Sequence, residues 1–139
     1  MRNTTGKKLS VLVVDDDPEA MAFACSTLEG RYTVLTAACG GDAVRIARES
    51  KPAAIVLDVI MPENEDGFSV FRTLHGDPAT REIPVILLTS VNEMTGLAFD
   101  SAEMEQYLGG KPAAFLEKPR SPDELMREVD KAVERRHAG

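Results

Sequence analysis

Side chains that could do chemistry follow the apolar runs of this sequence. Three consecutive aspartates, residues 15–17, come directly after the first apolar run, and Asp58 comes directly after the third. Thr89 and Lys118 come at the ends of two later runs. Each residue alone has an ordinary explanation, because Asp, Ser and Thr are common in turns. Their function therefore depends on whether the fold brings them together.

A cluster of carboxylates is unfavourable unless the repulsion between its negative charges is compensated. Two like charges about 4 Å apart repel by roughly 4 kcal/mol at an effective dielectric near 20, so such a cluster needs raised pKa values or a cation. Carboxylate oxygens without histidine or thiolate neighbours select a hard ion, and a site with few protein ligands suits Mg²⁺. Asp17 is assigned to helix capping instead, because Pro18 follows it.

A divalent cation beside Asp58 would favour phosphoryl transfer. It would neutralise the charge of an incoming phosphoryl group, whose oxygens need donors and cations around them. The Lys118 ammonium and the Thr89 hydroxyl are donors of this kind. Asp58 is then the candidate nucleophile, a carboxylate that forms an acyl phosphate.

Five short apolar runs predict strands, and most of them are bounded by Asp, Pro or Gly. The first, third and fourth are almost unbroken Val, Ile and Leu, which is typical of strands covered on both faces in a parallel sheet. The runs are Val11 to Val14, Thr33 to Leu35, Ala54 to Leu57, Val85 to Leu88, and Ala114 to Leu116.

Segments with helical spacing separate these runs. The last is the best signalled, since Ser121-Pro122-Asp123-Glu124 combines an N-cap, a proline at the first position and a capping-box glutamate. The segment from residue 92 to 108 predicts only a short or irregular helix, because Gly96 interrupts it. The buried faces expected for the other helices are Met21, Ala24, Cys25 and Leu28; Ala43, Ile46 and Ala47; Val70, Phe71 and Leu74; and, for the last helix, Leu125, Val129, Ala132 and Val133.

Alternation of strands and helices predicts an α/β, doubly wound fold with helices on both faces of a parallel sheet. Functional residues of such folds gather beyond the carboxyl ends of the strands. Because the first and third strands lie side by side, three carboxylates are expected to share one crevice, within reach of the ends of strands four and five.

Length and charge restrict the class of protein. The 139 residues, 43% of them hydrophobic, suffice for one domain with its own core. A formal net charge of −7 argues against direct binding to nucleic acid or an anionic membrane. Cys25 and Cys39 form no metal-binding pattern and are expected to be reduced and buried. Because no segment resembles a signal peptide or a membrane span, a cytoplasmic location is expected.

Four ordered motifs resemble those of the response-regulator receiver domain of two-component phosphorelay signalling. They cover nearly the whole chain, from about Leu9 to about Ala132. The motifs are Val11-Leu-Val-Val-Asp-Asp-Asp-Pro18, Ile55-Val-Leu-Asp-Val-Ile-Met-Pro62 with Asp66-Gly67, Pro84-Val-Ile-Leu-Leu-Thr-Ser90, and Phe115-Leu-Glu-Lys-Pro119. The resemblance implies a five-stranded sheet in the flavodoxin-like order 2-1-3-4-5, and one receiver domain over residues 1–139, with its core at about 9–134 and no output domain.

The resemblance also implies a role for each matching residue. Asp58 would be the phosphoacceptor. The chain would phosphorylate and dephosphorylate itself at this residue and would not be a turnover enzyme that acts on a separate substrate. Asp16 and Asp58 would bind Mg²⁺ directly, Asp15 through water, and Ile60 through its backbone carbonyl. Thr89 and Lys118 would contact the phosphoryl group. Thr89 and Phe115 would form the switch.

Partners follow from the same resemblance. A histidine kinase or a phosphotransfer protein would supply the phosphoryl group. The surface made by the fourth helix, the fifth strand and the fifth helix would change on phosphorylation, and a homodimer could form through it. No contact with nucleic acid or a membrane is expected.

The sequence departs from the family pattern in three places. Three residues separate Pro62 from Asp66 where two are usual, and the chain from Thr89 to Lys118 is several residues longer than usual. Phe115 stands at the switch aromatic position and has no hydroxyl to fix an inward rotamer.

Two other functions compete with a phosphoacceptor, and a third is excluded. A pseudo-receiver that binds partners without phosphorylation is opposed by the intact acids, hydroxyl and lysine. An aspartate-based phosphohydrolase would resemble Asp-x-Asp at the nucleophile, whereas this chain has Asp58-Val-Ile60. A flavin-binding reading is excluded, because three aspartates after the first strand would repel a phosphate.

Overall fold

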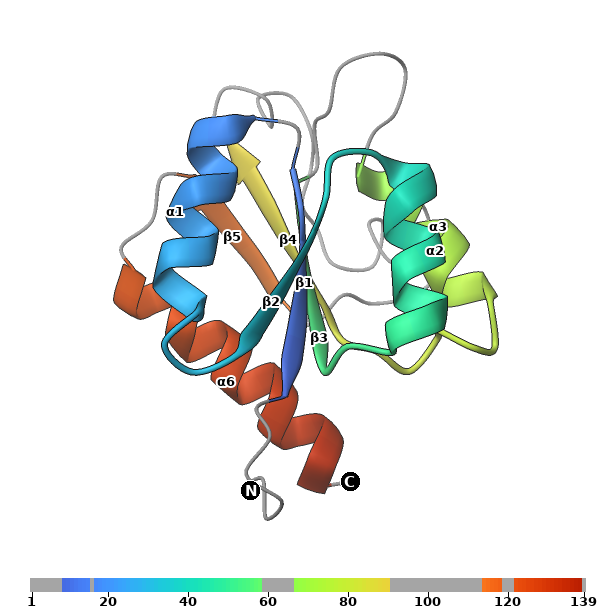
Figure 1. The fold of residues 1–139 in the computed structure, drawn as a ribbon. Helices are drawn as coiled ribbons and strands as arrows, with labels where there is room; N and C mark the ends of the chain where they lie inside the picture. Colours follow the sequence, from blue (N-terminus) through green and yellow to red (C-terminus); the bar gives the residue numbers. More distant parts are fainter. Residues whose placement is uncertain (1–8, 16, 59–66, 91–113, 119–121, 139) are drawn as a thin grey trace.

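A computed structural model describes residues 9–15, 17–58, 67–90, 114–118 and 122–138, and it describes side chains for all of these except 67–69, 89, 90, 114–118 and 135–138. These ranges contain five strands and four helices, and strands and helices alternate from the first strand to the fourth (Figure 1). The strands are β1 (Ser10–Val14), β2 (Thr33–Ala37), β3 (Ala54–Asp58), β4 (Val85–Ser90) and β5 (Ala114–Lys118), and the helices are α1 (Pro18–Leu28), α2 (Gly40–Ser50), α3 (Gly67–Gly76) and α6 (Pro122–Ala138).

The five strands form one sheet in the order β2-β1-β3-β4-β5, and every neighbouring pair is parallel. The predicted doubly wound α/β fold and its strand order are therefore confirmed. Because all strands run the same way, their carboxyl ends lie along one edge of the sheet.

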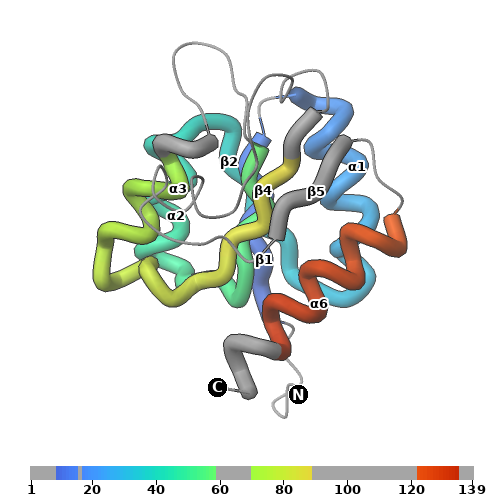
Figure 2. The backbone as a smooth tube through the Cα atoms, turned by 180° about the vertical axis from the view of Figure 1, so that it is seen from behind, coloured from blue at the N-terminus to red at the C-terminus, as the bar shows by residue number. Residues whose placement is uncertain are grey.

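Strands β1 to β4 each contribute to two hydrophobic cores, because successive side chains point to opposite faces of a sheet. Val11 and Val13 pack with residues of α1 and α6, whereas Leu12 and Val14 pack with residues of α2 and α3. Figures 1 and 2, taken from opposite sides, both show α1 and α6 over one face and α2 and α3 over the other. Burial on both faces explains why β1 and β3 are almost continuously apolar.

The helices begin and pack largely as their sequences predict. Pro18 is the first residue of α1, and the side chain of Asp17 caps the helix by accepting the Glu19 N–H. The faces predicted for α2, α3 and α6 are buried, apart from Ile46, which is half-buried; in α1, Ala24 and Leu28 are buried but Met21 and Cys25 only partly. None of the described helices has the length and the apolar composition needed to cross a bilayer.

The strand ends and the exposure of Cys39 differ from the predictions, and one predicted helix lies outside the described residues. Most strands extend beyond their apolar runs, so that Asp58, Ser90 and Lys118 are the last residues of β3, β4 and β5 and do not follow them. Cys39 is exposed, so its predicted burial was wrong, although both cysteines are free as expected. The helix predicted within 92–108 lies outside the described residues.

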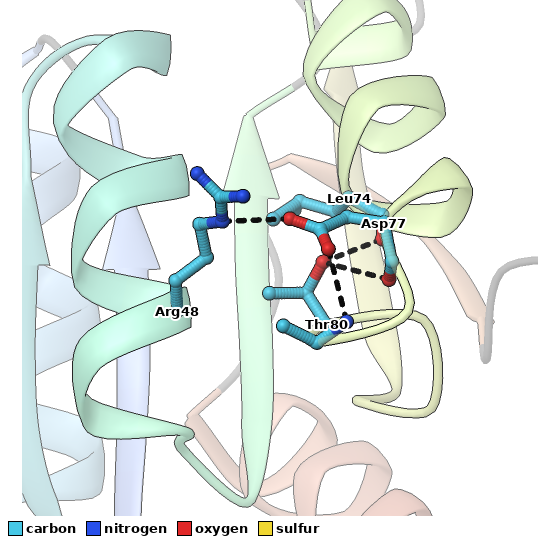
Figure 3. A network of polar contacts seen from close by, with 5 residues as sticks. Arg48, Leu74, Asp77 and Thr80 are labelled. Atoms are coloured by element: carbon cyan, nitrogen blue, oxygen red, sulfur yellow. Dashed lines mark hydrogen bonds and ion pairs between the residues drawn. The ribbon is translucent and has the colours of Figure 1, made fainter.

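A polar network joins α2 to the turn between α3 and β4 (Figure 3). The Arg48 guanidinium lies 2.7 Å from the Asp77 carboxylate, whose other oxygen accepts the Ala79 N–H at 2.9 Å. The Thr80 hydroxyl, which is 1% exposed, donates to the Leu74 carbonyl at 2.6 Å. A buried hydroxyl is costly without such a partner, so this hydrogen bond stabilises the turn.

Lys51 ends α2 in a left-handed conformation, with φ of 47°. Only glycine adopts this region without a steric penalty from Cβ. We therefore expect Lys51→Gly to raise the free energy of unfolding by about 0.5–1 kcal/mol, as measured by urea denaturation. Ser50→Gly, one residue earlier in the helix itself, is the control and should lower it by a similar amount. A destabilised Lys51→Gly protein would contradict the prediction.

Candidate functional site

Two carboxylates are buried at the carboxyl edge of the sheet. Asp58 ends β3 and Asp15 follows the last residue of β1, and each is 3% exposed. β1 and β3 are neighbours, with Val13 in register with Val56, so Asp15 and Asp58 occupy equivalent positions two residues further along. By the alternation of side chains, both belong to the rows that face α1 and α6. The two acids therefore lie at neighbouring strand ends, as the sequence predicts, and the third predicted carboxylate, Asp16, lies outside the described residues.

Hydrogen bonds fix the connection from β1 to α1. The Asp15 N–H donates to the Ala37 carbonyl at 3.1 Å, and the Asp15 carboxylate accepts the Asp17 N–H at 2.9 Å. The Asp17 carboxylate in turn accepts the Glu19 N–H at 3.2 Å. The assignment of Asp17 to capping is confirmed. The role of Asp15 in a turn was not predicted, although an aspartate two residues before an N-cap is a recognisable signal for it.

The carboxyl ends of β4 and β5 lie at the same edge of the sheet as Asp15 and Asp58. Asp58 is in register with Leu88, the residue before Thr89, and Ser90 is in register with Lys118. The backbone positions of Thr89 and Lys118 therefore lie one and two strands away from Asp58. Phe115 pairs with Leu87, further from the edge. The side chains of Thr89, Phe115 and Lys118, and all of Asp16 and Ile60, lie outside the described residues, so their predicted roles stay predictions.

The described acids fit a hard divalent cation. Two buried carboxylates at neighbouring strand ends repel each other in a medium of low polarity, and a cation between them relieves that repulsion. Within the part of the chain that the structure describes, no group of three or more His, Cys, Asp or Glu residues could hold a metal ion. Two oxygen-bearing side chains suit an ion that keeps several waters, as Mg²⁺ does, better than they suit zinc.

Comparison with known proteins places the chain among signalling modules. Residues 11–130 match the family model described as the response regulator receiver domain. Protein PilH of Pseudomonas aeruginosa is 32% identical over 123 residues, which are 86% of this chain and 93% of PilH. The transcriptional regulatory protein AfsQ1 of Streptomyces coelicolor is 40% identical over 83 residues, which span 60% of this chain but only 35% of AfsQ1.

A solved structure resembles this chain in both fold and sequence. The receiver domain of a sensor histidine kinase from Pseudomonas aeruginosa has a TM-score of 0.74 and 29% identity, over 91% of this chain and 98% of that one. In that protein a magnesium ion is coordinated in the active-site cleft. The fold of this chain is thus shared with a receiver domain along nearly its whole length.

Proposed function

This chain belongs to the response-regulator receiver domain family, and from that premise we propose that Asp58 accepts a phosphoryl group in a reaction that requires Mg²⁺. The observation that carries the proposal is the pair of buried carboxylates, Asp15 and Asp58, at neighbouring strand ends. These two carboxylates would offer oxygen ligands and negative charge to a cation, which would offset part of the cost of burying charge at this edge.

The chemistry follows from the residues at this edge. An oxygen of the Asp58 carboxylate attacks the phosphorus atom, the bond to the leaving group of the donor breaks, and an acyl phosphate forms. Lys118 and Thr89 donate hydrogen bonds to the phosphoryl oxygens. The side chains of Asp15, Asp16 and Asp58 and the carbonyl of Ile60 would hold Mg²⁺, which supplies positive charge for the oxygens of the transferred group.

The donor and the output complete the proposal. A histidine kinase or a phosphotransfer protein supplies the phosphoryl group, in the cytoplasm, and the chain turns over no separate substrate. Phosphorylation shifts Thr89 and lets Phe115 turn inward, which alters the surface of the 92–108 segment, β5 and α6. That surface would then bind a partner or a second copy of the chain. Such a two-state element lets a local charge change act at a distance.

Removal of the metal tests the proposed reaction. With acetyl phosphate as donor, we expect Mg²⁺ to give one phosphoryl group per chain, and EDTA to prevent labelling because the cation that supplies positive charge for the oxygens of the transferred group is then absent. Intact mass spectrometry measures both states, and addition of excess Mg²⁺ to the EDTA sample is the control that should restore labelling. Labelling that is undiminished in EDTA would contradict a metal-dependent site. No labelling under any condition would favour a phosphorylation-independent module.

A further inference from the structure

β2 forms one edge of the sheet, because in the described part of the chain it pairs with β1 alone. Figure 1 looks onto this edge, and no described helix or strand crosses in front of β2 where it lies between α1 and α2. The five residues of the strand, Thr33–Ala37, include no charged residue and no proline. Charge and proline are common on exposed edge strands, because they prevent pairing with another chain. This edge therefore remains able to pair with a further strand.

The hydrogen bonds to β1 indicate which backbone groups of β2 face outward. The Thr33 N–H donates to the Leu9 carbonyl at 2.9 Å, and at the other end of β2 the Ala37 carbonyl accepts the N–H of the residue that follows β1. Successive residues of a strand direct their backbone N–H and carbonyl groups to opposite sides, so every second residue from Thr33 faces β1. Val34 and Thr36 therefore direct their N–H and carbonyl groups away from the sheet.

We propose that this edge of β2 pairs with the same edge of a second copy of the chain, as antiparallel strands about a two-fold axis at Leu35. In this register Val34 of each copy lies opposite Thr36 of the other. Residues that are opposite in this way exchange two hydrogen bonds in an antiparallel ladder. All the outward backbone groups of both strands are then paired, and the two-fold axis limits the assembly to two chains.

The side chains along the edge fit a second copy as well. Val34 and Leu35 are half-buried and pack against different cores, one on each face of the sheet. In the dimer Leu35 meets Leu35 of the other copy, and Val34 meets the exposed, uncharged Thr36. The pairing has only four backbone hydrogen bonds and a few apolar contacts to set against the entropy of association, so we expect a weak dimer.

This inference goes beyond the proposed function and does not depend on it. β2 and β5 are the two opposite edges of the sheet. The surface that is proposed to respond to phosphorylation includes β5, so a dimer through β2 leaves it accessible and requires no phosphoryl group. The experiments therefore use the unphosphorylated protein.

Disulfide trapping measures the register. In the Cys25→Ser/Cys39→Ser protein, Leu35→Cys places two thiols opposite each other, where the Cα atoms of an antiparallel pair lie about 4.5 Å apart, within the range of a disulfide. We expect mild oxidation to give a cross-linked dimer on non-reducing electrophoresis. Thr33→Cys in the same background is the matched control. Its two Cα atoms would be separated by about 13 Å along the strands, so this variant should stay monomeric.

Sedimentation equilibrium measures the dissociation constant of the dimer. Under reducing conditions, and in about 0.5 M NaCl to screen the repulsion between two copies of net charge −7, the wild type should show a monomer–dimer equilibrium. Thr36→Pro removes an outward N–H and leaves pairing with β1 intact. It should weaken the dimer by roughly tenfold or more, because two hydrogen bonds are lost per dimer. Thr36→Ala keeps the N–H and should stay within about threefold of the wild type.

Three results would overturn the inference: a wild type that stays monomeric at millimolar concentration, equal cross-linking of the Thr33→Cys and Leu35→Cys variants, or a dimer that Thr36→Pro leaves unchanged. If Thr36→Pro does not fold, the two cysteine variants decide alone. A dimer that forms only after treatment with acetyl phosphate would also contradict pairing through β2, and it would leave the proposed phosphorylation of Asp58 intact.

Discussion

The Asp58→Asn variant is expected to incorporate no phosphoryl group from acetyl phosphate and Mg²⁺. An amide oxygen is a poor nucleophile and carries no negative charge for the cation, so both contributions of Asp58 are lost together. The variant should remain folded, because Asn has nearly the shape of Asp and the removed charge lies beside a second buried acid, Asp15. Intact mass spectrometry compares it with the wild type under the same conditions.

A matched control for this variant is Asp42→Asn, which makes the same chemical change at an exposed position. It should be labelled to the wild-type level. Full labelling of Asp58→Asn would place the nucleophile at another residue and remove the basis of the proposed reaction.

The second large effect is expected at Asp130, in the middle of α6. Its carboxylate accepts the Tyr32 hydroxyl with one oxygen and lies 2.7 Å from the Arg31 guanidinium with the other. Asp130→Ala should lower the free energy of unfolding by about 2 kcal/mol, because a buried hydroxyl then loses its acceptor. Arg31 adds little, since its side chain is 60% exposed.

Urea denaturation measures this effect. Glu128→Ala is the control on the same helix, because the Glu128 side chain is paired only with Lys131 at 3.5 Å in the described ion pairs and should contribute little. A change at Asp130 as small as that at Glu128 would mean that the Tyr32 hydroxyl finds another acceptor.

The same contact gives stability a dependence on alkaline pH. Burial raises the pKa of Tyr32 above its ordinary value of 10.0, and the hydrogen bond to Asp130 and the negative charge of that residue raise it further. A pKa that is higher in the folded state means that stability is complete below about pH 10 and falls as the pH rises further. Tyr32→Phe should remove the part of this loss of stability that comes from the Tyr32 hydroxyl. The difference between the free energies of unfolding of the wild type and the variant, measured across this pH range, isolates that part.

Much of the fold could be predicted from the sequence, because a strand that is buried on both faces is an almost unbroken run of apolar residues. Runs such as Val11 to Val14 do not alternate with polar residues, and this excludes a half-exposed sheet. Strand ends were predicted too early because polar side chains such as Asp58 can continue backbone pairing at the edge of a sheet. Apolar patterns mark burial and not hydrogen bonding, so they cannot show where pairing stops.

The site was predicted in part for a similar reason. Asp15 and Asp58 each come directly after a buried apolar run of the sequence, and the topology brings such positions together. Contacts between distant segments leave no local pattern, and Tyr32 and Asp130 are 98 residues apart in the sequence. Cys39 was expected to be buried because cysteine usually is, but it is the N-cap residue of α2, in the exposed connection between β2 and that helix.

The most direct test of the central claim is the location of the phosphoryl group in the wild-type protein. After treatment with acetyl phosphate and Mg²⁺, the intact mass should rise by one phosphoryl group, and hydroxylamine, which cleaves acyl phosphates, should remove it. Peptide mapping after the acyl phosphate is trapped should place the modification at Asp58. A phosphoryl group that resists hydroxylamine, or one that maps to a peptide without Asp58, would contradict the account.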